Sequence, residues 1–216
     1  TEAEEQDLPQ LLQKTLNAVE RAKSAAGKSD QEVMFGGLEG TLKQLAKATA
    51  ELTEQAQEQA EKQQKSEDDA TKASDELKIA LKQQIDQGLV AVEQDEDKVI
   101  VTVGAGGAFA SGSADLTPEA IAIMKQIAGV NSENDSEITV SGHTDDVPLI
   151  FGSRYRDNWD LAAARSASVV QSLSFDGVIE DDRLEAISYG ESRPVESNET
   201  SAGRSKNRRI EIEINY

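Results

Sequence analysis

The spacing of the apolar residues changes at Gly88, and this change limits the folds that each part of the chain can adopt. Residues 1–88 contain one proline, Pro9, and are mostly Glu, Gln, Lys and Ala around leucines at helical spacing. In the stretch 98–103 valines occupy every second position, which is typical of a strand with one buried face. The sequence therefore predicts an acidic, helical or partly disordered linker over residues 1–88 and a folded domain over residues 89–216.

The apolar positions of the linker do not define a single structure. Leu38, Leu42, Leu45 and Leu52 recur at helical spacing, and a shorter stripe lies within residues 8–19. Beyond Leu52 only alanines continue the pattern, whereas a stable coiled coil needs several firm heptads. Two alternatives stay open: a solvated helix or disordered segment, and a coiled coil. In both cases we expect the segment to act as a spacer.

The second part of the chain has the pattern of a compact α+β domain. The expected elements are a hairpin within 89–103, a helix capped by Thr117 and running to about Gly129, a strand at 137–141, a helix from Asn158 with Trp159 on its apolar face, and strands at 183–190 and 208–216. The order strand, helix, strand, helix, strand, strand over about 125 residues fits an ordinary single domain.

Composition excludes several classes of function. The net charge of -19 opposes binding to phosphate backbones, so we expect no nucleic-acid partner. The absence of cysteine and the single histidine exclude thiolate and multi-histidine metal centres, and we expect no metal and no cofactor. No stretch reaches the length of an apolar membrane span. Because the chain begins with threonine, we expect an upstream segment to be missing.

The candidate site is the loop that begins with SGHTDDVPLI, residues 141–150. This loop leaves the end of a predicted strand and reaches the predicted helix at Asn158. A helix N-terminus presents unpaired N–H groups and a partial positive charge, which suit an anionic group. Arg165 follows Asn158 by two helical turns, with Leu161 between them, and Asp145 is expected to fold back over the same place.

The pair Asp145 and Arg165 has two interpretations. A carboxylate and a guanidinium held a few ångströms apart form a receptor for a zwitterion, because one takes an ammonium and the other a carboxylate. The same two residues are also able to form a mutual salt bridge that closes the loop on the helix. The residues by themselves leave both interpretations open.

Catalytic and metal-binding interpretations of the loop are weaker. Asp145 and Asp146 are adjacent on an exposed loop, with no apolar surroundings to separate their pKa values for acid and base roles. No Gly-X-Ser-X-Gly elbow is present to form a triad with His143. His143 is therefore interpreted as a structural residue, and the loop has too few ligands for a divalent ion.

Four stretches in the second part carry a family resemblance: SGHTDDVP, NWDLAAARSASVV, RLEAISYGESRPVESN and GRSKNRRIEIEI. Together they resemble the OmpA-like peptidoglycan-binding domain over about residues 89–216. More narrowly, they resemble the periplasmic part of flagellar motor stator proteins of the MotB/PomB family. The helix motif departs from the usual pattern at Ala162 and Ser166, and the family's membrane helix, with its ion-carrying aspartate, is not present in this sequence.

The resemblance implies a βαβαββ sandwich that forms a homodimer and binds the diaminopimelate of peptidoglycan without catalysis. It implies the ligand residues Asp145 and Arg165, with a pocket lined or supported by Thr144, Asn158, Leu161, Asn207 and Arg208. It further implies the periplasmic region of a protein anchored in the bacterial inner membrane, joined through the missing N-terminal segment to a membrane-embedded stator protein of the MotA/PomA type. The alternative is a wall anchor of another envelope machine, such as a type VI secretion component.

Overall fold

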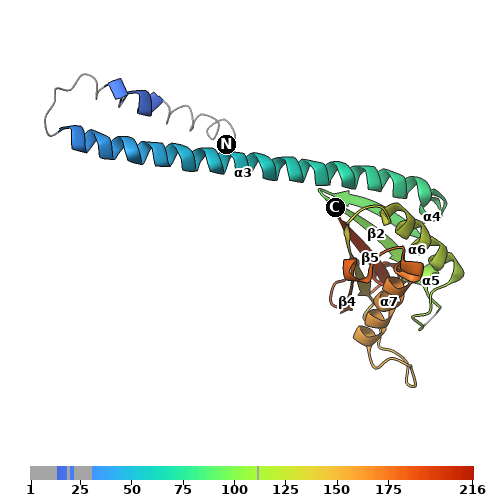
Figure 1. Cartoon of the computed structure of the whole chain (residues 1–216). Coiled ribbons are helices and arrows are strands. Elements are labelled where there is room, and N and C mark those ends of the chain that lie inside the picture. Colours follow the sequence, from blue (N-terminus) through green and yellow to red (C-terminus); the bar gives the residue numbers. More distant parts are fainter. Residues whose placement is uncertain (1–13, 19, 22–30, 111) are drawn as a thin grey trace. The chain divides into compact units, whose positions relative to one another are not determined.

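The structure, a computed structural model, describes residues 14–18, 20–21, 31–110 and 112–216 (Figure 1). The chain divides into two compact units, Thr1–Gln64 and Lys65–Tyr216. Helix α3, Gln31–Ala80, contributes to both units. The part of the expected apolar stripe at residues 8–13 and 19 lies outside the described residues, and the side chain of Leu38 is not described.

Within the first unit, α3 is a solvated helix. Leu45 and Leu52 are exposed. Ion pairs one helical turn apart stabilise this stretch, each by a few tenths of a kcal/mol: Lys43–Glu39, Lys47–Glu51 and Lys62–Glu58. The helical form of the linker prediction is therefore confirmed for the described part of this unit. Pairing with a second copy as a coiled coil stays a prediction.

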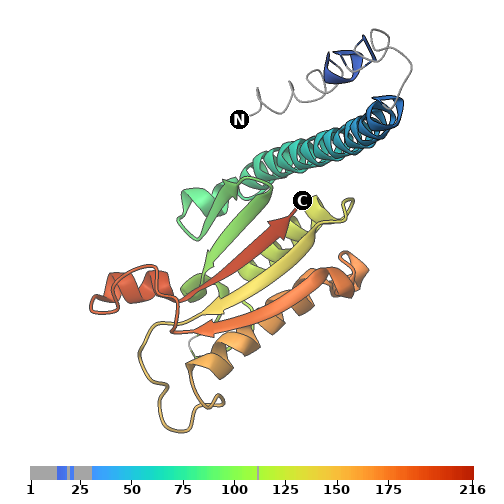
Figure 2. The ribbon, with the colours of Figure 1, turned by 90° about the vertical axis from the view of Figure 1, so that its left-hand side faces the viewer.

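The second unit is built on one five-stranded sheet, shown face-on in Figure 2. Its strands are β1 Val90–Asp95, β2 Lys98–Gly104, β3 Glu137–His143, β4 Leu184–Gly190 and β5 Arg209–Asn215. The order across the sheet is β1-β2-β5-β3-β4. The β3–β4 pair is parallel and the other pairs are antiparallel.

The alternating pattern of the sequence builds the buried face of this sheet. Val99, Val101 and Val103 lie opposite Ile214, Ile212 and Ile210 across the β2–β5 pair, and all six are buried. Helices α6, Pro118–Asn131, and α7, Asn158–Leu173, pack over the buried face and against each other. The α+β prediction of a sheet covered by helices is confirmed.

Local capping residues begin both helices where the sequence predicts them. The Thr117 side chain accepts a hydrogen bond from the backbone N–H of Ala120, and the Asp157 side chain accepts one from the backbone N–H of Asp160.

Four short elements were not expected: α5 Ala105–Ala108, η1 Phe175–Gly177, η2 Asp181–Arg183 and α8 Ser201–Asn207. The prediction that Trp159 faces the core is wrong, because its side chain is 45% exposed and lies over Gly190.

The end of α3 belongs to the folded unit. Ala70, Leu77 and Leu81 are fully buried in the same core cluster as Val99 and Ile212. The helix ends at Ala80, a short helix α4, Lys82–Asp86, follows, and Gly88 has the positive φ of 70° that ends the helical stretch. The division between the units therefore lies after Gln64 rather than after residue 88 as expected. The expected boundary follows the change in periodicity, but a helix that packs on a sheet continues the core across it.

Candidate ligand site at the end of strand β3

The candidate loop begins where β3 passes very close to α7. A side chain at Gly142 would place its Cβ 2.3 Å from the carbonyl oxygen of Ala162, so only glycine fits there. The ladder between β3 and β4 shifts register at Gly142 and His143, and the N–H of Thr144 donates to the carbonyl of Gly190 at 2.8 Å. The close approach therefore places the first residues of the loop at the N-terminal part of α7.

Asp145 is held in place by both of its carboxylate oxygens. The Nη1 atom of Arg208 donates to Oδ2 at 2.5 Å, and the N–H of Val147 donates to Oδ1 at 3.3 Å. The Nδ2 of Asn158, at the start of α7, donates to the carbonyls of Asp145 and Val147 at 3.2 and 3.1 Å. These contacts close the loop on the helix, and Asp145 is 8% exposed.

Arg165 is also buried, at 5% exposure, and its anchors are separate from Asp145. Its Nε donates to the carbonyl of Ser113 at 2.9 Å, and its guanidinium carbon lies 4.9 Å from the centre of the Phe109 ring. Burial lowers the pKa of Arg165, as does the nearby charge of Arg208, while Tyr155 and Asp145 act in the opposite direction. The guanidinium is thus a fixed positive charge on a poorly solvated surface.

The mutual salt bridge between Asp145 and Arg165 is not the arrangement that the structure has. Among the described residues, the ion pair of Asp145 is with Arg208, and the hydrogen bond of the Arg165 side chain is to Ser113. The salt-bridge interpretation of this pair is therefore not supported, and the zwitterion receptor stays a prediction.

The other predicted residues take supporting positions. Thr144, Asn158 and Leu161 are buried beside the loop and the first turns of α7. Asn207 is fully buried at the end of α8, where its side chain accepts from the N–H groups of Val195 and Glu196 and donates to Asn198 and the Glu196 carbonyl. It therefore fixes the turn before α8 and the backbone next to Arg208, and it makes no hydrogen bond with Asp145 in the described part of the chain.

Two residues that hold Arg165 were missed by the sequence interpretation. Phe109 and Ser113 lie in the loop between α5 and α6, which closes on itself through a bridge between Phe109 and Leu116. The sequence offers one signal for these two residues, the stretch GAFASGSADL, where one aromatic residue stands among small residues. Its contact with α7 is not readable from local spacing.

His143 lies in a buried polar cluster beneath the loop. Its Nε2 is 3.5 Å from a carboxylate oxygen of Glu211, at the limit of a hydrogen bond. The Nε of Arg209 donates to the other Glu211 oxygen at 2.7 Å. His143 and then Arg209 lower the pKa of Glu211 to about 2, against the effect of burial. No group of three or more potential metal ligands exists among the described residues. A structural role for His143 fits these contacts.

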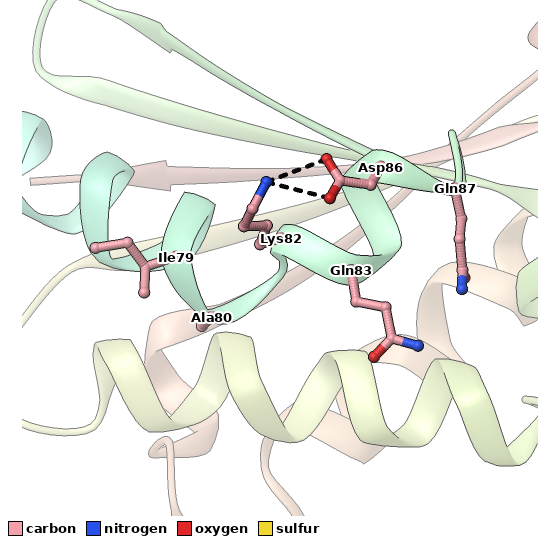
Figure 3. A pocket seen from close by; sticks show the side chains of 6 residues that line it. All are labelled: Ile79, Ala80, Lys82, Gln83, Asp86 and Gln87. Atoms are coloured by element: carbon pink, nitrogen blue, oxygen red, sulfur yellow. Dashed lines mark hydrogen bonds and ion pairs between the residues drawn. The ribbon is translucent and has the colours of Figure 1, made fainter.

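A hollow elsewhere in the unit does not coincide with the site. Figure 3 shows it at the junction of α3 and α4, lined by Ile79, Ala80, Lys82, Gln83, Asp86 and Gln87. Its one ion pair among these residues, Lys82–Asp86 at 3.1 Å, is exposed. The candidate site lies instead at the buried charges of Asp145 and Arg165, because desolvated charges bind ions more strongly than solvated ones.

Residues 108–208 match the model of the OmpA family. The chain is 35% identical over 117 residues to motility protein B of Bacillus subtilis, a match that covers 54% of this chain and 44% of that protein. The chain thus matches less than half the length of this curated relative.

Two solved structures are also similar. A MotB-like protein from Desulfovibrio vulgaris superimposes with a TM-score of 0.64 at 26% identity, over 71% of this chain and 94% of that one. The cell wall anchor of the type VI secretion system from Pseudomonas aeruginosa superimposes with a TM-score of 0.58 at 30% identity, over 64% of this chain and 96% of that one. Residues 108–208 therefore form an OmpA-family region, and the folded unit that contains them is an OmpA-like region of the motility protein B type.

Proposed function

We propose that the folded unit is a non-catalytic binding domain for peptidoglycan that contains diaminopimelate. The observation that carries the proposal is the separate anchoring of a buried carboxylate, Asp145, and a buried guanidinium, Arg165, in one site. The far end of a diaminopimelate side chain bears one ammonium and one carboxylate, which these two groups complement. The similar secretion-system protein is a cell wall anchor, which supports the same ligand class.

Co-sedimentation with purified sacculi tests this proposal. Wild type should pellet with diaminopimelate-type sacculi, and Asp145→Asn should weaken binding by about tenfold, because a charged hydrogen bond to the ammonium is lost. Asp146→Asn is the matched control: it removes the neighbouring, exposed carboxylate and should bind like wild type. Equal loss in both variants, or release of muropeptide fragments by wild type, would contradict non-catalytic binding through Asp145.

We further propose that the domain anchors a flagellar motor stator to the wall from the periplasm, with residues 1–64 as the spacer. The match to motility protein B supports this assignment, and the similarity to the secretion-system anchor favours the alternative. None of the described helices is long and apolar enough to cross a membrane. The upstream coding sequence discriminates the two: one membrane span with an embedded aspartate, joined to a protein of the MotA/PomA type, supports the stator, and a larger cytoplasmic domain supports secretion.

We propose that the chain is a homodimer that assembles through the unit Lys65–Tyr216. The chain's net charge of -19 opposes association, so sedimentation should show a modest dimer that is weaker at low salt. A chain shortened to residues 65–216 should dimerise as the full chain does. A tight dimer formed by residues 1–64 alone would contradict this assembly and support the coiled coil.

A further inference from the structure

Each oxygen of the Asp145 carboxylate accepts a hydrogen bond from the chain itself. Oδ2 accepts from Arg208 and Oδ1 accepts from the N–H of Val147. An incoming ammonium that takes the position of the Arg208 guanidinium on Oδ2 competes with it, because both are cations that donate to the same oxygen.

The two partners of this ion pair differ in how firmly the fold holds them. The Asp145 side chain is 11% exposed and lies on a loop closed by Asn158. The Arg208 side chain is 39% exposed, and its one hydrogen bond among the described residues is to Asp145. The Arg208 backbone is fixed, since its N–H donates to Arg204 and its carbonyl accepts from Ala105. Arg208 therefore has a partly exposed side chain on a fixed backbone, next to a buried carboxylate.

The charges of the site also favour Arg208, rather than Arg165, as the partner that a ligand displaces. It contains one carboxylate and two guanidinium groups that lie near enough for Arg208 to act on Arg165 electrostatically. With Arg208 paired to Asp145, Arg165 remains to attract a carboxylate, and the ammonium position is filled from within the chain. When a zwitterion enters, the Arg208 guanidinium has solvent to move into, whereas Arg165 stays packed against Phe109.

We propose that Arg208 is an internal stand-in for the ammonium of the ligand, and that its displacement from Asp145 sets the affinity and the selectivity of the site for ligands with a free amine. This inference rests on the proposed function. It differs from the pocket-lining or supporting role that the family resemblance implies for Arg208, because a supporting Arg208 and a displaced Arg208 predict opposite effects of removing its charge.

The test is calorimetric titration of the full chain with a soluble muropeptide that contains diaminopimelate. Arg208→Met should tighten binding by about three- to tenfold, because the free carboxylate no longer has an internal partner. Arg208→Met should not tighten the binding of the same muropeptide with its diaminopimelate amine acetylated, since that ligand has no ammonium to pair with Asp145. Arg208→Lys should return the affinity toward that of wild type.

Arg154→Met is the matched control, because it removes the same charge from an exposed side chain in the loop before α7 and should bind both probes as wild type does. Weaker binding of Arg208→Met to the free-amine probe would make Arg208 a direct ligand and overturn the inference alone. An equal gain for both probes would also overturn it, since displacement by the amine would not be the cause. If neither wild type nor Arg208→Met binds the muropeptide, the result contradicts the proposed function and, with it, the inference.

Discussion

Replacing Arg165 with alanine is expected to weaken binding to diaminopimelate-type sacculi by about ten- to a hundredfold. The guanidinium is buried and fixed by Ser113 and Phe109, so it meets a ligand carboxylate without first losing side-chain freedom or a full hydration shell. Peptidoglycan with lysine in place of diaminopimelate keeps the amine and lacks this carboxylate. Wild type should therefore bind lysine-type sacculi more weakly by a similar factor.

The comparison of the two wall types separates recognition from a structural role. On lysine-type sacculi, Arg165→Ala should cause little further loss, because the substitution and the change of wall remove the same interaction. Arg165 also anchors the carbonyl of Ser113, so a melting curve of each variant must accompany the sedimentation. Arg154→Ala, at an exposed position, is the control for loss of one charge. Equal binding of wild type to both types of sacculi would contradict the prediction that Arg165 recognises a carboxylate.

Leu77→Ala is expected to lower the free energy of unfolding by about 2–5 kcal/mol, the usual cost of truncating a fully buried leucine. The matched control is Ile79→Ala, two positions along the same helix, whose side chain is 77% exposed and labelled in Figure 3. That variant should stay within about 0.5 kcal/mol of wild type. Urea unfolding followed by circular dichroism measures both.

Truncation provides an independent measurement of the same boundary. A chain that begins at Lys65 should keep the unfolding midpoint of the folded unit, whereas one that begins at Leu89 loses Ala70, Leu77 and Leu81 from the core and should be several kcal/mol less stable. If the chain from Leu89 unfolds at the same denaturant concentration as the chain from Lys65, the packing of α3 contributes nothing and the boundary belongs at residue 88.

The sequence by itself determined the features that depend on neighbouring residues. The alternating valines and isoleucines of β2 and β5 define a buried face whatever lies against it. Thr117 caps α6 because a hydroxyl three residues before an N–H group reaches it without help from the rest of the chain. The loop that holds Asp145 was also found locally, since it joins the end of a strand to the N-terminus of α7.

The tertiary structure alone decided which charges pair and where the folded unit begins. Asp145 meets Arg208, 63 residues away, and Arg165 meets Ser113, 52 residues away. Leu77 belongs to the core although its neighbours in sequence have the composition of a linker. Contacts between distant segments leave no periodicity in the sequence, because the partner of a side chain is set by how the helices and strands pack. The fold therefore decides which arginine pairs with Asp145, and hence which side chain a ligand has to displace.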